Sequence, residues 1–189
     1  MLKSLFIKCL FIFSILVFGG YTVMAESKNL SQKCLILKLK DGDVAIELRP
    51  DLAPNHVARI IELTNQGFYN GVVFHRVIEG FMAQTGDPTG TGSGGSGKKL
   101  KAEFSNEPHI RGTVSMARAA SPDSADSQFF IVYEPARYLD GQYTVFGKVV
   151  KGMDYVDMIR KGDNSNNGAV TNPDKIISAS IVDAADCSH

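Results

Sequence analysis

From residue 34 onward, turn signals containing glycine or proline divide the sequence into many short β-type runs. These runs of apolar and β-branched residues occupy residues 34–40, 44–48, 72–78, 81–84, 113–117, 128–133, 143–150 and 175–182. Helical spacing is found in two stretches, one between Pro54 and Gly67 and one that carries Met153, Val156 and Ile159. So many short strands with two helices indicate an antiparallel barrel or sandwich and exclude alternating β-α units.

Residues 33–189 are expected to form a single domain. They contain no internal repeat, charge run or linker, and a chain of 189 residues with 44% hydrophobic residues can bury a sizeable core. The 20 basic residues equal the 20 acidic ones, which argues against a nucleic-acid binder held by phosphate contacts. No amphipathic stripe is left over for a partner, so we expect a monomer.

Residues 1–25 have the pattern of an export signal. Two lysines form a basic start, an apolar run begins at Cys9, and Val23 and Ala25 supply the small residues of a cleavage site. The alternative is an uncleaved membrane anchor, but the uncharged stretch of 17 residues from Cys9 contains two glycines and is short for a bilayer span. We therefore predict cleavage, no stable membrane insertion of the mature chain, and a location in the periplasm, or outside the cell if no outer membrane exists.

Cleavage changes the charge and the context of the cysteines. The mature chain would have 164 residues, beginning with a polar leader at 26–32, and its 18 basic and 20 acidic residues give a net charge of −2. Export would place Cys34 and Cys187 in a compartment that permits disulfides. Two alternatives remain open: two free thiols, or a bond that closes nearly the whole mature chain.

The glycine-rich segment 87–99 partly matches nucleotide-binding patterns. Gly90, Gly92 and Gly95 satisfy G-x-G-x-x-G, but Lys99 stands where a phosphate loop needs a Ser or Thr for Mg²⁺. No helix pattern follows, so the helix N-terminus that would attract phosphate is missing. A flexible surface loop is the better interpretation, and a nucleotide enzyme is the weakest alternative.

No conventional catalytic pattern is present elsewhere. The four histidines have no partners at metal-ligand spacing, and neither H-E-x-x-H nor G-x-S-x-G occurs. The sequence therefore predicts neither a metal nor a cofactor.

Arg76 is a charged residue inside a strand-like run. Alternation along this run places Phe74, Arg76 and Ile78 on one face, with His75 and Val77 on the other. From the pattern alone, Arg76 is best interpreted as a residue on a solvent-facing side of a strand. The same reasoning interprets the following large apolar residues as core: Phe81, Met82 and Phe130.

Blocks in the same region nevertheless resemble the signature blocks of the cyclophilins, which are peptidyl-prolyl cis-trans isomerases. These blocks are Phe74–Asp87, with the pattern F-H-R-V-x-x-x-F-M-x-Q-x-G-D, then Met116-Ala117, Ser127–Ile131, and Leu139-Asp-Gly with Val145–Val149. The resemblance implies a mainly β fold, a closed eight-stranded antiparallel barrel capped by two α-helices. It also implies a groove that binds the X-Pro unit of proline-containing polypeptides.

The resemblance further implies roles for individual residues. Arg76 matches the catalytic arginine and Gln84 matches a glutamine that supports it. Phe81, the third residue assigned to catalysis, matches a position that lines the proline pocket. The other positions that match the groove are His75, Met82, Ala117, Arg118, Ala119, Gln128, Phe130, Tyr138, Leu139 and Tyr143. The implied activity is rotation about X-Pro bonds during the folding of exported proteins. The alternative is a holdase or scaffold that binds proline-containing segments without turnover.

Three of these residues depart from the family pattern. Tyr138 stands where a Trp is often found, and the loss of the indole implies weakened binding of the inhibitor cyclosporin. Tyr143 replaces a His, and Arg118 replaces an Asn. These two changes are expected to alter which residues are preferred beside the proline.

Overall fold

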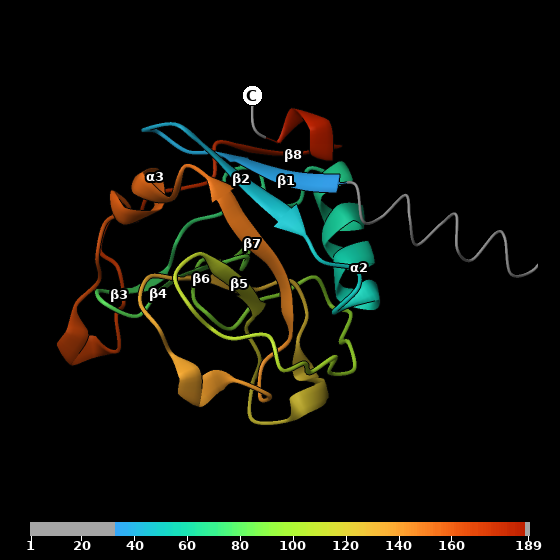
Figure 1. Ribbon diagram of the computed structural model, residues 1–189. Coiled ribbons are helices and arrows are strands. Elements are labelled where there is room, and N and C mark those ends of the chain that lie inside the picture. Colours follow the sequence, from blue (N-terminus) through green and yellow to red (C-terminus); the bar gives the residue numbers. More distant parts are fainter. Residues whose placement is uncertain (1–32, 188–189) are drawn as a thin grey trace, which may run out of the picture.

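The structure is a computed structural model that describes residues 33–187 (Figure 1). Its strands are β1 Lys33–Lys38, β2 Asp43–Leu48, β3 Arg76–Ile78, β4 Met82–Thr85, β5 Thr113–Met116, β6 Phe129–Val132, β7 Val145–Lys151 and β8 Ser178–Asp183. The helices are α2 Pro54–Asn65 and α3 Met153–Asp157, with single 3-10 turns η1 Pro122–Ser124, η2 Arg137–Leu139, η3 Asn164–Asn166 and η4 Ala184–Asp186. The expected signal peptide and polar leader lie outside the described residues.

The eight strands form one antiparallel sheet in the order β3-β4-β6-β5-β7-β2-β1-β8. The segments leading into the two edge strands also pair with each other. The Gly71 N–H donates to the Ile176 carbonyl over 2.7 Å, and the Phe74 N–H donates to the Asp174 carbonyl over 2.9 Å. The predicted mainly β, barrel-like architecture with two α-helices is therefore confirmed. The two ends of the sheet are joined by the segments that precede β3 and β8, not by these two strands themselves.

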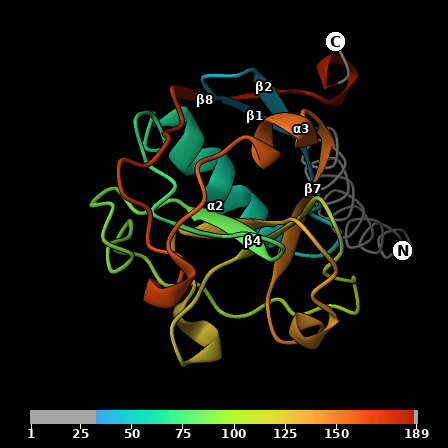
Figure 2. The ribbon, with the colours of Figure 1, turned by 90° about the vertical axis from the view of Figure 1, so that its left-hand side faces the viewer.

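The helix α2 packs against β7 and β8, and α3 packs against β2 (Figure 2). Pro54 occupies the first turn of α2, where its missing N–H costs no hydrogen bond. The Glu103 carboxylate accepts the N–H groups of Asn55 and His56 at this helix end, over 3.1 and 3.0 Å. No helix in the described part of the chain is long and apolar enough to cross a bilayer.

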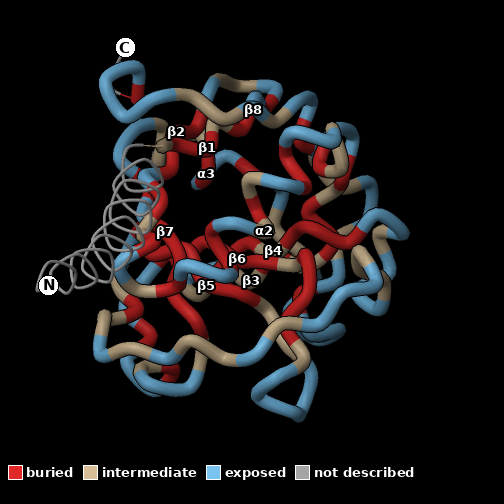
Figure 3. Tube along the Cα trace, turned by 90° about the vertical axis from the view of Figure 1, so that its right-hand side faces the viewer, coloured by how far each residue is buried: buried red, intermediate tan, exposed pale blue. Residues whose placement is uncertain are grey.

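The inner face of the sheet and the covered face of α2 enclose the main core. Fully buried side chains concentrate along the strands, whereas the connecting loops are largely exposed (Figure 3). The largest fully buried members of this core are Tyr69, Phe74, Phe129 and Phe146. Three of these rings meet edge to face, with Phe129 between Tyr69 and Phe146.

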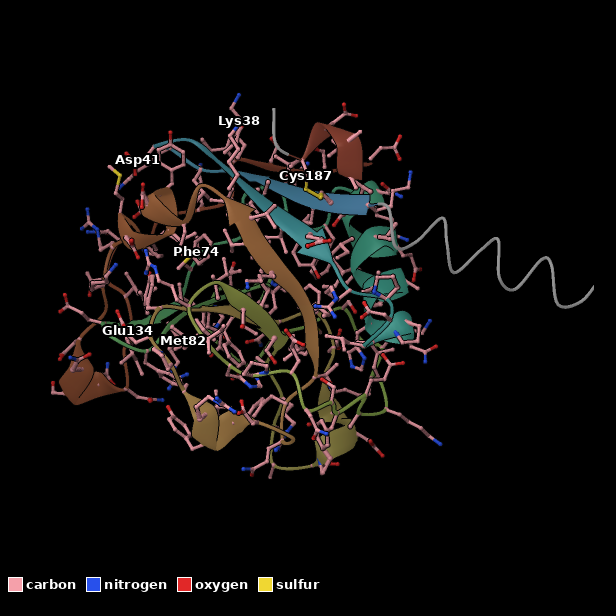
Figure 4. The ribbon with its side chains drawn as sticks, viewed as in Figure 1. Lys38, Asp41, Phe74, Met82, Glu134 and Cys187 are labelled. Carbon is pink, nitrogen blue, oxygen red and sulfur yellow. A yellow bond between two sulfur atoms is a disulfide. The ribbon has the colours of Figure 1, made fainter. Side chains whose placement is uncertain are left out.

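Cys34 and Cys187 form a disulfide, with their Cα atoms 6.0 Å apart (Figure 4). The bond joins β1 to the end of η4 and is buried against Ala45. Of the two alternatives that the sequence left open for these cysteines, the structure therefore has the bonded one. The crosslink spans a sequence separation of 153 residues.

Candidate active site

The register of β3, β4 and β6 builds a second, outward-facing surface. Arg76 lies opposite Gln84, and Gln84 lies opposite Phe130. One step along, Ile78 lies opposite Met82, which in turn lies opposite Val132. Because directly paired residues point to the same side of a sheet, these side chains share one face. The intervening residues belong to the main core on the other face: Val77, Ala83 and Ile131.

The expectation that Phe74 shares a face with Arg76 is wrong. β3 begins only at Arg76, so the two-residue alternation of a strand does not extend back to Phe74. Phe74 is fully buried in the main core together with Val77, whereas Arg76 is half-buried on the outward face.

A separate apolar cluster covers this outward face. Its buried members are Met82, Phe130, Val132, Ala136 and Leu139, and its half-buried members are Ile78, Phe81, Ala117 and Tyr143. The structure thus gathers the large apolar residues that the sequence pattern assigned to the core into a second, shallower cluster. Because the family resemblance implies a proline pocket that includes several of these nine residues, we call the cluster the apolar pocket; Met82 is labelled in Figure 4.

Arg76 is held rigidly at the edge of the apolar pocket. Its Nη1 donates to Gln84 Oε1 over 3.1 Å, while Nε and Nη2 donate to the carbonyl and side-chain oxygens of Asn167, both over 3.0 Å. Nη1 also lies 3.9 Å from the sulfur of Met82, so one edge of the guanidinium faces the pocket. Burial lowers the pKa of Arg76 from its ordinary value, but an arginine remains charged at any physiological pH.

Asn167 is a site residue that sequence reasoning missed. It follows η3 with a φ of 52°, a left-handed conformation that asparagine tolerates better than most residues. It lies 91 residues from Arg76 along the chain, and no sequence spacing connects the two.

The support of Arg76 continues through two glutamines to the glycine-rich loop. Gln84 Nε2 donates to Gln128 Oε1 over 2.9 Å. Gln128 Nε2 in turn donates to the carbonyls of Gly92 and Gly94, over 3.0 and 2.8 Å. The loop therefore forms one side of the site.

The glycine-rich segment is organised around a buried carboxylate. Asp87 accepts the N–H groups of Thr89, Gly92 and Gly94, over 2.7, 2.6 and 3.0 Å. Burial alone would raise the pKa of Asp87, but these donors outweigh it and lower the pKa to about 2. These N–H groups are the ones a phosphate would need, and the carboxylate already occupies them. The loop is therefore better described as a support for Gln128 and Gln84 than as a nucleotide site.

Several of the other predicted groove residues contact one another. Arg118 stacks on the ring of Tyr143, 4.5 Å from its centroid, and its Nε donates to the Gln142 carbonyl over 3.1 Å. The ring of Tyr138 lies 5.9 Å from that of Phe81. Two predicted groove residues are exposed, Ala119 and Tyr138.

His75 and His109 are two histidines that lie beside residues of this site. His75 is buried beside Gly92, and burial lowers its pKa. His109, which sequence reasoning did not select, lies behind Phe130, with their ring centroids 6.2 Å apart. Within residues 33–187, no three His, Cys, Asp or Glu side chains gather in a way that could hold a metal ion.

Comparison with known proteins identifies the family of this chain. The profile of the family described as cyclophilin type peptidyl-prolyl cis-trans isomerase/CLD matches residues 34–181. A probable peptidyl-prolyl cis-trans isomerase of Brucella suis is 60% identical over 162 residues, which covers 79% of this chain and 83% of the relative. Peptidyl-prolyl cis-trans isomerase B of Bacillus subtilis is 48% identical over 128 residues, covering 66% of this chain and 89% of that protein.

Solved structures show the same fold. A cyclophilin type peptidyl-prolyl cis-trans isomerase of Cryptosporidium parvum, crystallised in the presence of the dipeptide Ala-Pro, superimposes with a TM-score of 0.72 at 30% identity. The match covers 79% of this chain and 98% of that one. The cyclophilin AquaCyp293 from Hirschia baltica gives a TM-score of 0.70 at 28% identity, with 85% and 79% of the two chains covered. The chain therefore belongs to the cyclophilin-type peptidyl-prolyl cis-trans isomerase family, and it is a peptidyl-prolyl cis-trans isomerase.

Proposed function

We propose that Arg76 is the catalytic residue of this isomerase and that the apolar pocket holds the substrate proline. The reaction is slow without a catalyst because amide resonance imposes a rotational barrier of ~18–20 kcal/mol. The cis and trans forms of an X-Pro bond differ by only about 0.5–1 kcal/mol, so the obstacle is kinetic. The catalyst must therefore bind the twisted bond more tightly than either planar form.

The chemistry of the twisted bond suits a guanidinium. When the bond is perpendicular, resonance is lost and the prolyl nitrogen carries a lone pair that can accept a hydrogen bond. In each planar form that lone pair is delocalised, so a donor aimed at the nitrogen stabilises the transition state selectively. No nucleophile, acid–base pair or metal is required for this step.

The observation that carries the proposal is how Arg76 is held. A guanidinium has five N–H groups, and Gln84 and Asn167 accept three of them. The two that remain belong to the Nη atoms, one of which already lies against Met82 at the pocket. Because the fork is planar and fixed, holding three donors also fixes the direction of the other two. Arg76 is therefore oriented before the substrate arrives.

The test is a protease-coupled isomerisation assay on a prolyl tetrapeptide. We expect Arg76→Ala to lower kcat/KM by about 100-fold, the scale on which removal of an aimed donor acts. Arg160→Ala removes an exposed arginine outside the groove and should retain full activity. Near-full activity in a folded Arg76→Ala variant would assign catalysis to another residue. Suppression of client aggregation by an Arg76→Ala variant that lacks turnover would show that the holdase role coexists with catalysis.

We further propose that the protein is exported and assists the folding of exported proteins in the periplasm, or outside a cell that has no outer membrane. Two observations support this: residues 1–25 have the pattern of a cleaved signal, and Cys34 and Cys187 form a disulfide of the kind that persists in oxidising compartments. Mass spectrometry of the protein from fractionated cells tests the proposal. A mature chain starting at Glu26 outside the cytoplasm would support it, and an intact cytosolic chain would contradict it.

One finer property follows from the proposed groove. Cyclosporin should bind weakly, because Tyr138 offers less contact area than an indole and no ring N–H at this rim.

We also propose that the mature protein is a monomer, which size-exclusion chromatography with light scattering would test. A stable dimer at micromolar concentration would contradict it.

A further inference from the structure

His109 is a buried polar ring that lies behind the groove rather than in it. Its side chain is 1% exposed, and it belongs to the segment that leads into β5. Nδ1 lies 3.1 Å from Asp140 Oδ1, and Nε2 lies 3.1 Å from Ser115 Oγ. Both ring nitrogens are therefore held, which fixes the plane of the ring.

The fixed ring packs on two walls of the apolar pocket. It lies nearly parallel to Phe130, at an interplanar angle of 19° with the centroids 6.2 Å apart. Tyr143 meets it edge-on at 6.5 Å and meets Phe130 edge-on at 5.8 Å. The three rings contact one another, and two of them face the proposed proline site.

The backbone of His109 is hydrogen-bonded to both ends of η2, which forms a third wall of the pocket. Its N–H donates to Asp140 Oδ1 over 2.8 Å, and its carbonyl accepts the N–H of Ala136 over 2.8 Å. Ala136 and Asp140 flank η2, which carries Tyr138 and Leu139. This one residue is thus bonded to both ends of the 3-10 turn that closes the groove.

The hydrogen-bond chemistry of the ring explains why a histidine suits this position. The Asp140 carboxylate can only accept, so Nδ1 carries a proton. Ser115 Oγ, 2.9 Å from the Thr144 carbonyl, can either donate to Nε2 or accept from it while donating to that carbonyl. The ring is therefore held at both ends whether it is neutral or protonated. An apolar ring of similar size would fill the space without either bond.

The pairing of β5, β6, β4 and β3 connects the His109 ring to Arg76. Ser115 on β5 lies opposite Phe130, Phe130 lies opposite Gln84, and Gln84 lies opposite Arg76. A shift of the Phe130 ring would displace the proline relative to the guanidinium, which Asn167 holds from a different segment. Misplacements of about 1 Å can cost up to 100-fold in rate.

We propose that His109 is a positioning residue for the isomerisation, which fixes Phe130 and η2 so that the proline nitrogen meets Arg76. The proposal rests on the role of Arg76 proposed above. It predicts a loss in kcat rather than in substrate affinity, because the pocket stays apolar when the ring loses its hydrogen bonds.

The test compares two buried histidines that each bind a carboxylate. His109→Phe keeps the aromatic volume and removes both side-chain hydrogen bonds. His56→Phe also keeps the aromatic volume and removes the one side-chain hydrogen bond of His56 on α2, where Nδ1 lies 2.6 Å from Glu103 Oε2 outside the groove. We expect His109→Phe to lower kcat at least 10-fold with KM changed less than twofold, and His56→Phe to retain the wild-type kcat. A folded His109→Phe variant with the kcat of the His56→Phe variant would overturn the proposal.

A measurement on the wild-type protein covers the case in which His109→Phe does not fold. Binding of the prolyl tetrapeptide should shift the NMR signals of the His109 ring and leave those of His56 in place. Unshifted His109 signals at saturating peptide would overturn the proposal. If Arg76→Ala retained activity while His109→Phe lost it, the pocket role would stand and the proposed role of Arg76 would fall.

Discussion

Arg76 Nη1 donates to Gln84 Oε1 over 3.1 Å, and the two residues lie directly opposite each other on β3 and β4. The Gln84 amide cannot flip without loss, because its Nε2 already donates to Gln128 Oε1. A flipped amide would present N–H groups to the guanidinium and an oxygen to another oxygen. Gln84 is therefore fixed as an acceptor for Arg76, and its role is to orient that side chain.

Replacing Gln84 with leucine should test this orientation. Leucine has a similar volume but offers no acceptor, so Arg76 would keep only its contacts with Asn167 and Met82. We expect kcat/KM for a prolyl tetrapeptide to fall about 10-fold, because an imprecisely aimed donor stabilises the twisted bond less. The fold should persist, since Gln84 is only half-buried at the outward face.

Gln66→Leu provides the matched control. Gln66 is exposed at the end of α2, so this variant has the same change in side chain without a change in the site. Equal kcat/KM for the two variants would show that Gln84 does not orient Arg76.

Much of the architecture could be predicted because it rests on local patterns. Short β-type runs and two helical stretches were enough to indicate an antiparallel barrel or sandwich. Local patterns do not show which face of a short strand points into the core when the neighbouring strands are unknown. β3 has three residues, so alternation drawn from residue 72 placed Phe74 and Arg76 on the same side, whereas the structure separates them.

The candidate site was predictable only through the family resemblance. From spacing alone, Met82 and Phe130 are indistinguishable from core residues, since both are buried and apolar. No sequence motif or spacing marks Asn167 or His109, because their partners are distant in sequence and the contacts exist only once the chain has folded. Long-range polar contacts of this kind require the structure.

Reduction of the Cys34–Cys187 disulfide should destabilise the protein without inactivating it. The bond closes a loop of about 150 residues, for which the chain-entropy estimate gives up to about 5 kcal/mol in the free energy of unfolding. Both cysteines belong to a buried cluster that shares no residue with the apolar pocket, so activity of the folded protein at 25 °C should not change. Urea unfolding of the mature protein with and without dithiothreitol measures the effect.

The control for this prediction is the double variant Cys34→Ser/Cys187→Ser, whose unfolding midpoint should not respond to dithiothreitol. Two reactive thiols in the unreduced mature protein, or identical midpoints with and without reductant, would contradict the predicted stabilisation.

Tyr138→Trp should strengthen cyclosporin binding. Tyr138 is 65% exposed at the groove rim, and its ring lies 5.9 Å from that of Phe81. An indole at this position adds contact area and an N–H donor, together worth about 1–2 kcal/mol, which is about 10-fold in Kd. Isothermal titration calorimetry of both proteins measures the change. Tyr155→Trp on α3 is the control, and an equal gain in that variant would assign the effect to something other than the rim.

Two buried histidines should make the protein less stable as the pH falls below about 6.5. Burial lowers the pKa values of His75 and His109 below 6.5, although Asp87 and Asp140 partly oppose this effect. As the pH falls, the unfolded chain therefore binds these protons before the folded protein does. The free energy of unfolding then decreases, with a slope of at most two protons from this pair.

The carboxylates of Asp87 and Asp140 titrate at lower pH than the histidines, so the two contributions to stability can be measured separately. The pKa values of Asp87 and Asp140 are lowered to about 2, so the stability they contribute is lost only between pH ~4 and pH ~2. Urea unfolding between pH 7.5 and 5 therefore isolates the histidine contribution. His75→Asn should remove about one proton from the slope, because of this pair only His109 remains. An unfolding free energy that is flat across this range, or an unchanged slope in His75→Asn, would show that these rings do not remain neutral in the folded protein as inferred.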